Sequence, residues 1–501
     1  MQIKRQARLA TALCFAASAA LAQPVDTLRT AVEQAVNTNP EVAARFHAYR
    51  AAADAVDIAR AGYFPRLDAT ASLGYDSNRY TGLNPDNGSV SRTSAGLSLT
   101  QLLWDGLGTR HEVARFGHDR LARYFELRDT TEQIALEAAR AHVDVQRFRR
   151  LVQLAEDNYV QHRYAYLQIQ SRVRAGVGRG VDLEQANARI ALAESNLTSE
   201  VANLHDVTAR YQRIVGVAPP RDLPTTPVLR DGVPATAADA MTLAVRQSAA
   251  ISASIETLRA ARSLVDVRES AYQPRVEARL RSSVGRNLDG IQDQSRNSTA
   301  EIVLNWNLFN GGADQARVRQ QTSLLRQAGD LRDKTCRDTR QVTAIAYNDT
   351  RKLADQGVYL ERNSSSIEKA RDAYRQQFDI GQRSLLDLLN AENEVYTARR
   401  AQANAGHDLD HAFARTHASM HQLVSQVGLS PTDTATGEAA GWEPGEDAPG
   451  RCPLIPIEAS ALERAELDAR AARMATGTAP LAPPPGLAPR TVPAPPPIRR
   501  P

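Results

Sequence analysis

Residues 275–285 read RVEARLRSSVG, a stretch in which charged and apolar side chains alternate with a period of two residues. One side of this extended chain carries Arg275, Glu277, Arg279 and Arg281. The other side carries Val276, Ala278, Leu280 and Val284. Such alternation predicts a β-strand with one polar face and one apolar face.

Three further stretches alternate in the same way, so the sequence predicts four strands. We expect them at residues 66–76, 94–104, 275–286 and 299–309. The last of these places Glu301 on its polar side. A strand of roughly 10 residues suits a tilted crossing of the apolar layer of an outer membrane.

The chain also repeats itself, and the strands therefore come in two pairs. Three shifts bring the halves into register: 209 residues for 31–69 on 240–278, 205 for Ser94 on Thr299, and 203 for Gly178 on Gly381. This self-similarity predicts a tandem duplication, with a first repeat at 23–238 and a second at 239–429.

Each repeat contains helix-forming sequence before and after its strands. Asn39 and Pro40 predict the N-cap and the first position of a helix that precedes the first strand. After the strands, long runs without proline predict helical hairpins at 107–216 and 313–428. The first helix of such a hairpin would be about 100 Å long at about 1.5 Å per residue, which is too long for an ordinary globular domain.

The two ends of the chain differ in composition from the repeats. Residues 1–22 combine basic residues, an apolar run and a closing Ala-Leu-Ala, a pattern that predicts a cleaved secretory signal peptide. Residues 430–501 are rich in proline, and we expect this tail to be disordered in the periplasm. Beyond the signal, no apolar run is long enough for a membrane-spanning helix.

Two cysteines remain after removal of the signal peptide, Cys336 in a helical run and Cys452 in the tail. Export to an oxidising compartment would allow them to form a disulfide. The simpler interpretation is two unrelated thiols, and the sequence alone does not choose between them.

Four amphipathic strands cannot stand alone in a bilayer, because an open sheet edge leaves unpaired backbone groups in hydrocarbon. Bacterial barrels need at least about 8 strands, so several chains would have to pool theirs. Three chains would give roughly 12 strands and a lumen wide enough for charged side chains. A soluble β-sandwich with one wet face is the alternative, but it does not explain the long helices beside the strands.

Composition and motifs disfavour an enzyme or a nucleic-acid-binding protein. The net charge is only +4 over 501 residues and is spread along the chain. The histidines at 407, 411, 417 and 421 have helical spacing that would permit a metal site. No glutamate accompanies them in a metalloprotease pattern, so we expect no catalytic residues, metal or cofactor.

Over residues 27–429 the sequence resembles the TolC-type outer-membrane efflux and secretion channels. The resemblance rests on YFPRL and YQPRV before the strands, LLWDGLG and WNLFNGG after them, and GVDLEQANARIALAESNL and GQRSLLDLLNAENEV in the second helices of the hairpins. It implies a homotrimer with a 12-stranded barrel in the outer membrane and a long α-helical barrel in the periplasm. It also implies an exit duct that works with a periplasmic adaptor and an inner-membrane pump, either ABC-type or proton-driven.

The resemblance further implies a gate at the periplasmic tip. Arg383 matches a gate-linking arginine, Asp182 an aspartate that can pair with it, and Asp387 the first acid of a pore-constricting ring. Two positions depart from the pattern, because Phe378 stands where a gate-linking tyrosine is expected and Asn390 where a second ring acid is expected. We therefore expect one carboxylate ring at this constriction.

Helical spacing supports part of this gate without the family. At about 100° per residue, Arg383, Asp387, Asn390 and Glu394 fall within about 60° of one another on a polar stripe. The opposite side carries Leu385, Leu388, Leu389 and Tyr396, with Leu386 beside the stripe. The alternative is an ordinary solvated helix face with an i,i+4 ion pair between Arg383 and Asp387.

A periplasmic adaptor with a helical hairpin is the alternative function. Adaptors lack paired amphipathic strands between helices in two copies, which this chain is predicted to have. The exported substrate stays open, because type I protein secretion and multidrug efflux would both use this architecture.

Overall fold

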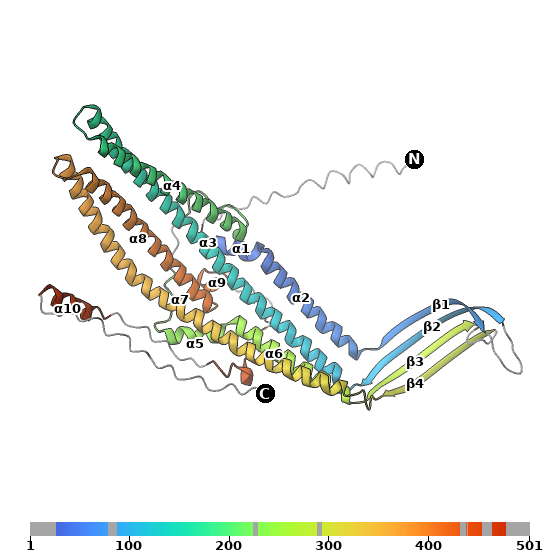
Figure 1. Cartoon of the computed structure of the whole chain (residues 1–501). Coiled ribbons are helices and arrows are strands. Elements are labelled where there is room, and N and C mark those ends of the chain that lie inside the picture. The colour runs from blue at the N-terminus through green and yellow to red at the C-terminus, as the bar shows by residue number, and fades with distance from the viewer. Residues whose placement is uncertain are drawn as a thin grey trace, which may run out of the picture. The chain divides into compact units, whose positions relative to one another are not determined.

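The computed structural model describes residues 27–78, 88–223, 229–287, 293–430, 437, 439–452 and 463–476. The expected signal peptide at 1–22 and the proline-rich residues 477–501 lie outside this part of the chain. The chain divides into two compact units, residues 1–456 and 457–501. The second unit contains helix α10, Arg464–Ala475, and the other described elements belong to the first unit (Figure 1).

The strands form one antiparallel sheet in the order β1-β2-β3-β4. Their bounds are β1 Arg66–Asn78, β2 Gly88–Trp104, β3 Arg275–Arg286 and β4 Gln294–Asn305. Each β-hairpin, β1-β2 or β3-β4, thus comes from one repeat. The pairing of β2 with β3 joins the two repeats at the centre of the sheet. β1 and β4 are the two edges.

The register gathers the expected polar side chains on one face, since partners in an antiparallel pair point to the same side. Arg279 pairs with Thr100 on β2 and with Glu301 on β4. On this face Glu277 accepts hydrogen bonds from Arg275 Nε at 2.6 Å and from Arg279 Nη2 at 2.7 Å. Arg281 Nη1 lies 3.6 Å from Glu301 Oε1.

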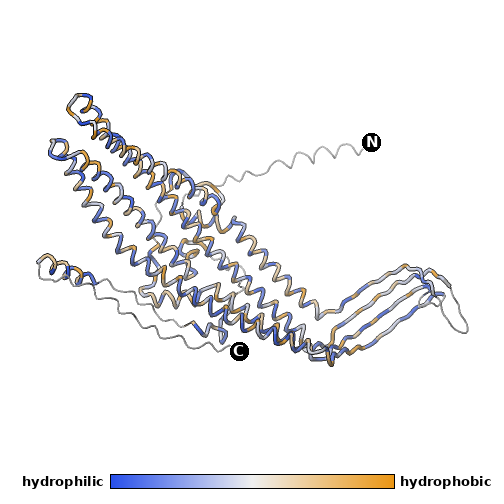
Figure 2. The backbone as a smooth tube through the Cα atoms, viewed as in Figure 1, coloured by the Kyte–Doolittle hydropathy of each residue, from blue (hydrophilic) through white to orange (hydrophobic). Residues whose placement is uncertain are grey.

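The other face of the sheet is apolar and uncovered in the single chain. Leu67 is 67% exposed, Leu73 87% and Ile302 73%. Figure 2 shows the corresponding alternation of hydrophilic and hydrophobic residues along the strands. A face of this kind needs lipid or protein against it to bury its side chains.

The prediction for the fourth strand was wrong at both ends. The expected range was 299–309, whereas β4 ends at Asn305, opposite the first residue of β3. Beyond that point β3 has no residue left to pair with, because Pro274 precedes it and carries no N–H. Trp306 instead donates its indole N–H to the carbonyl of Tyr272 at 3.0 Å, and Leu308 and Phe309 are exposed.

Nine helices fill the rest of the described part of the first unit. They are α1 Leu28–Thr38, α2 Pro40–Arg60, α3 Gly108–Arg174, α4 Gly180–Val215, α5 Ala237–Gln247, α6 Ala249–Glu269, α7 Ala313–Asp379, α8 Leu385–Ser419 and α9 Leu423–Gln426. Short 3-10 turns lie at Ala61–Tyr63, Ser270–Tyr272 and Gly445–Asp447. None of the described helices is both long and apolar enough to cross a membrane.

The repeat is visible in helix lengths and caps. α3 and α7 both have 67 residues. As predicted, Asn39 caps α2, and its side chain accepts from the N–H of Glu41 at 2.9 Å with Pro40 at the first position. Ser248 caps α6 in the equivalent place and accepts from Ile251 N–H at 3.2 Å.

Helix α3 contacts four other long helices and links the two repeats. Nearer the sheet it contacts α2 and α6, and α6 contacts α7. Toward the hairpin turns it contacts α4 and α8, and α8 contacts α7 (Figure 1). α1 and α9 pack on this layer around a core that includes Val32, Ala138, Tyr211 and Leu423.

A segment of the tail is fixed to the helices, which corrects the expectation of a disordered tail. Residues 439–452, here named the strap, end in a disulfide between Cys452 and Cys336 of α7. Of the two alternatives that the sequence left open for these cysteines, the structure has the disulfide. Trp442 of the strap packs edge-on against Phe125 of α3, with ring centroids 4.8 Å apart.

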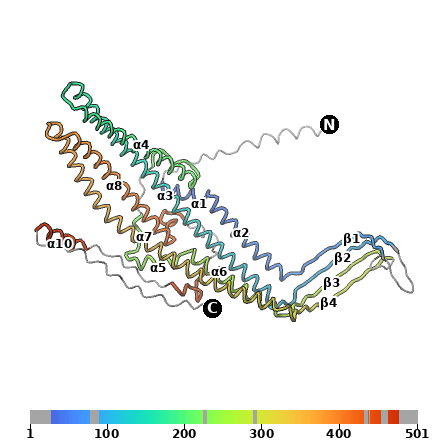
Figure 3. Tube along the Cα trace, viewed as in Figure 1, coloured from blue at the N-terminus to red at the C-terminus, as the bar shows by residue number. Residues whose placement is uncertain are grey.

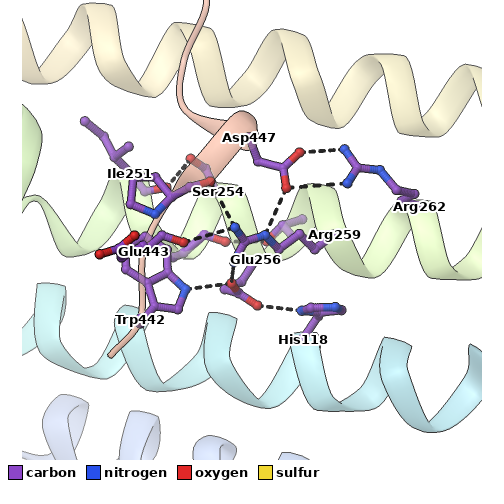
Figure 4. Close-up of polar contacts among 12 residues, drawn as sticks. His118, Ile251, Ser254, Glu256, Arg259, Arg262, Trp442, Glu443 and Asp447 are labelled. Carbon is purple, nitrogen blue, oxygen red and sulfur yellow. Dashed lines mark hydrogen bonds and ion pairs between the residues drawn. The ribbon is translucent and has the colours of Figure 1, made fainter. Parts of the chain in front are cut away.

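Polar contacts seat the strap on α6 (Figure 4). Glu256, fully buried, accepts from Trp442 Nε1 and Arg259 Nη1, both at 2.7 Å, and lies 2.7 Å from His118 Nδ1. Burial alone would raise the pKa of Glu256, but the hydrogen bonds from His118 and Trp442 outweigh it and lower that pKa. Asp447 accepts from Arg259 Nε at 3.0 Å and from Arg262 Nη2 at 2.5 Å.

We predict that Cys452→Ser lowers the thermal unfolding midpoint. The disulfide joins residues 116 apart in sequence. Closing a loop of that size restricts the unfolded chain by roughly 4–5 kcal/mol in the chain-entropy model. Calorimetry should show that the reduced wild type unfolds at the same temperature as the variant. Reductant should not change the unfolding temperature of the variant itself. Two free thiols in the denatured, unreduced wild type would contradict the assignment.

Candidate functional site

The turns of the two helical hairpins lie together at the end of the helices away from the sheet (Figure 3). Each turn has a glycine in the left-handed region soon after the first helix ends. These are Gly176, with φ of 77°, and Gly381, with φ of 80°. A side chain with a Cβ is strained in that region, so glycine permits each chain reversal.

The geometry of the turns corrects the repeat register expected for this region. The sequence shift of 203 equated Gly178 with Gly381, but the glycine with positive φ in the first turn is Gly176. α3 and α7 have equal length, and α4 and α8 begin at Gly180 and Leu385. A shift of 205 therefore holds through both turns, and it makes Asp182 the counterpart of Asp387.

Asp387 is the third residue of α8 and takes part in capping that helix. Its N–H donates to Ser384 Oγ at 3.2 Å, and Ser384 Oγ–H donates to Asp387 Oδ2 at 2.9 Å. Arg383 Nη1 lies 3.6 Å from the same carboxylate, with both side chains 39% exposed. The hydrogen bond from Ser384, followed by the charge of Arg383, lowers the pKa of Asp387, so it is ionised at neutral pH.

Arg383 binds groups of its own hairpin. Its Nε donates to Gln377 Oε1 at 3.0 Å, and its guanidinium lies 4.3 Å from the centre of the Tyr374 ring. Within the described part of a single chain, no ion pair joins Arg383 to Asp182. The expected link between these residues is therefore not made inside one chain.

Phe378 has a packing role in the single chain. It is buried in a cluster with Ile169 of α3, Ala186 of α4 and Leu389 of α8. The guanidinium of Arg172 lies 5.0 Å from its ring centre. Where a tyrosine hydroxyl was the expected pattern, an aromatic ring here joins the two hairpins by apolar contact.

The remaining stripe residues differ in their partners. Asn390 accepts a hydrogen bond from Arg189 Nη2 of α4 at 2.6 Å. Glu394 is exposed. The opposite side of α8 is buried as expected, with Leu385, Leu388, Leu389 and Tyr396 all at 9% exposure or less.

Sequence reasoning missed Arg189, although a signal for it exists. Arg189 lies seven residues after Asp182, which places both on nearly the same side of α4. With the corrected register, Glu394 occupies the counterpart position on α8. Arg189 therefore follows Asp182 on α4, and Glu394 follows Asp387 at the equivalent position on α8.

Buried ion pairs between helices were also missed. Glu392, 5% exposed, accepts from Arg371 Nη1 of α7 at 3.0 Å and also from Arg375. Glu200 of α4, 3% exposed, lies 2.7 Å from Arg400 Nη2 of α8. Single acidic residues inside long polar helices give no sequence signal of burial.

The four histidines make separate contacts. His411 Nε2 lies 2.9 Å from Asp144 Oδ1, and His417 Nε2 lies 3.0 Å from the carbonyl of Leu229. His421 Nε2 accepts from the N–H of Ala249 at 3.3 Å, and His407 lies 3.7 Å from Asp410. Among the residues with described positions, no group of three potential metal ligands comes together.

Comparison with known proteins finds outer-membrane efflux and secretion proteins. The family model described as outer membrane efflux protein matches residues 31–216 and 241–419. The outer membrane efflux protein BepC of Brucella suis is 26% identical over 408 residues, 81% of this chain and 87% of BepC. The alkaline protease secretion protein AprF of Pseudomonas aeruginosa is 26% identical over 275 residues, 53% of this chain and 56% of AprF.

The fold agrees with these matches. The crystal structure of the CmeC outer membrane channel of Campylobacter jejuni superposes with a TM-score of 0.72 at 15% identity, covering 83% of this chain and 90% of CmeC. The predicted resemblance is confirmed, and the matches favour a channel over an adaptor. Because the two matched ranges fall on its two repeats, the chain belongs to the outer membrane efflux protein family.

Proposed function

We propose that three copies of this chain pool their sheets into a 12-stranded barrel in the outer membrane and form the exit duct of a tripartite export system. The observation that carries this proposal is the sheet itself. Its apolar face is uncovered, its polar face carries Arg275, Glu277, Arg279, Arg281 and Glu301, and β1 and β4 lack outer partners in the described chain. Pairing β1 of one copy with β4 of the next removes every edge.

In this arrangement the two faces have different surroundings. The apolar face contacts outer-membrane lipid, and the arginine and glutamate side chains line the aqueous lumen. The hairpins of three chains continue the duct through the periplasm, where their turns meet the adaptor that connects to an inner-membrane pump. The relatives include an efflux protein and a protease secretion protein, so the pump sets whether the cargo is a small molecule or a protein.

We further propose that the hairpin turns form the gate. Asp182 and Asp387 occupy equivalent positions, so a trimer would place two sets of three carboxylates near the axis, rather than the single ring expected from sequence. Arg383 and Phe378 hold the second hairpin closed. The adjoining part of the constriction is lined by Glu394 and by Asn390, which is bonded to Arg189. Ionised acids gathered at one level attract divalent cations.

The duct is tested by reconstitution. The protein purified in detergent should cross-link to trimers and produce discrete conductance steps in planar lipid bilayers. Variants that place a charge on the lipid-facing side, such as Leu73→Arg, should insert poorly, because an arginine in hydrocarbon costs about 2–4 kcal/mol at the bilayer midplane. Leu467→Arg in the separate C-terminal unit is the matched control. A protein that stays soluble without detergent and gives no conductance would rule out the duct.

We predict that Arg383→Ser and Asp182→Ala each raise the resting conductance several-fold. Each removes a charged group that holds the turns together, and the pair is not formed within one chain. If Arg383 and Asp182 pair between subunits, the double variant should conduct no more than either single variant. Asp157→Ala, an exposed acid on α3, serves as the control. Conductance equal to wild type in both single variants would remove these residues from the gate.

Substituting Asp387 separates its charge from its capping role. Asp387→Asn removes the charge but keeps an oxygen that accepts from Ser384, whereas Asp387→Ala removes both. Both variants should weaken block by divalent cations, and only Asp387→Ala should speed hydrogen exchange in the first turn of α8. Asp182→Asn should weaken the block to a similar extent. Full block in Asp387→Asn would exclude a carboxylate ring at this position.

A further inference from the structure

A cavity of about 510 Å³ lies where the C-terminal end of α8 meets the N-terminal end of α6, between α3 and α7. This volume falls within the range of about 300–1,000 Å³ that is typical of small-molecule sites. Its apolar lining includes Leu136, Val342 and Ile345. Its charged lining includes Glu132, Arg140 and Arg415.

Leu136 and Arg140 of α3 line the cavity. Ala138 and Ala141 pack in the core with α1, and Leu136 also lies against that core. In the proposed trimer we assign the opening of the cavity to the interior of the duct, an assignment that rests on the proposed function.

Polar contacts between α3 and α8 form a ladder that ends at this cavity. Arg147 Nη1 lies 2.9 Å from Asp408 Oδ1, and one turn further Asp144 Oδ1 lies 2.9 Å from His411 Nε2. In the same antiparallel register the next positions are Arg140 and Arg415, which are close enough for their charges to repel. An ion pair and a histidine–aspartate contact are thus followed by two arginines.

The two arginines of this rung are incompletely satisfied. Arg140 makes no hydrogen bond or ion pair with any described residue. Arg415 uses Nη2 to bind Asp349 of α7, while its Nε is buried without a partner. Burial, followed by repulsion from Arg415, lowers the pKa of Arg140, although the charges of Glu137 and Asp144 act to raise it.

The acids that line the same cavity have partners of their own. Asp129 accepts from Gln133 Nε2 at 2.6 Å and lies 3.3 Å from His421 Nε2. Asp338 binds Lys334. Arg415 is paired with Asp349, so Arg140 is the guanidinium of this cavity that has no ion pair with a described residue.

Glu132, 9% exposed, marks the other end of the cavity. It accepts from the backbone N–H groups of Leu423 and Val424, while its Oε2 is buried with no partner among the described residues. Burial raises its pKa to about 7, so much of it is protonated at neutral pH and its carboxyl group can donate a hydrogen bond.

We propose that this cavity binds an amphipathic organic anion in transit through the duct. Its carboxylate or sulfonate bridges Arg140 and Arg415, and its apolar body lies on Leu136, Val342 and Ile345. A bidentate anion supplies a counter-charge to Arg140 and accepts from the donors left free on both guanidiniums. The site thus gives the duct a binding preference for acidic small molecules with an aromatic or aliphatic body.

Calorimetry on the full chain in phosphatidylcholine nanodiscs tests the site with a matched pair of probes. 1-Naphthaleneacetate should bind, and 1-naphthylmethylammonium, which has a similar ring and the opposite charge, should not. Arg140→Gln should weaken binding of the anion about tenfold through loss of one charge-assisted contact. Arg140→Lys should restore part of the affinity, and Arg362→Gln, an exposed arginine on α7, should leave it unchanged.

Removing a like-charged neighbour should not destabilise the fold, so Arg140→Gln should unfold at or above the wild-type temperature. Equal binding of the two probes, or unchanged affinity in Arg140→Gln, would overturn the proposal. Loss of probe binding in nanodiscs of phosphatidylglycerol would identify the occupant as a lipid and overturn its assignment to cargo. Normal conductance steps without probe binding would refute this site alone, whereas binding without conductance would refute the duct alone.

Discussion

Backbone hydrogen bonding at the sheet edges is the constraint on which the other features depend. β1 and β4 each pair on one side only within the described chain, and the apolar face between them is uncovered. In water such a sheet would expose both its edges and its leucines. In a bilayer it becomes favourable only when every edge is paired, which requires further copies of the chain. In the proposed duct, oligomerisation is then a condition for membrane insertion rather than a later step.

Equal lengths of α3 and α7 keep the two repeats in register from the sheet to the hairpin turns. β2 and β3 are neighbours, so α3 and α7 start at the same end of the sheet. Because both have 67 residues, their turns come at the same level and Asp182 and Asp387 fall at matching heights. An insertion of a single residue in either helix would rotate the following stripe by about 100° and, in the proposed trimer, remove one set of acids from the axis.

The sequence predicted the features that depend on periodicity and failed where contacts depend on tertiary packing. Alternation in 275–285 identified β3, and Asn39-Pro40 identified the start of α2, because each signal lies within one element. The strap escaped prediction because Trp442 and Asp447 sit in a proline-rich region, and their partners Glu256 and Arg259 are distant in sequence. At the candidate gate, the i,i+4 pair of Arg383 and Asp387 was predictable, whereas Arg189 and the true position of Asp182 required the geometry of the turns.

The same helices are fastened differently at their two ends, and this difference fits a duct with a gate. Nearer the sheet than the turns, α6 and α7 are held by the strap through its disulfide and the buried Glu256 network. Toward the turns, α8 is held to α3 and α4 by ion pairs and hydrogen bonds such as Arg147–Asp408 and Arg189–Asn390. Such pairs exchange partners with water at small net cost once they are exposed. In the proposed duct, the turns that carry the two aspartates are thus the end without a covalent link between helices and the tail.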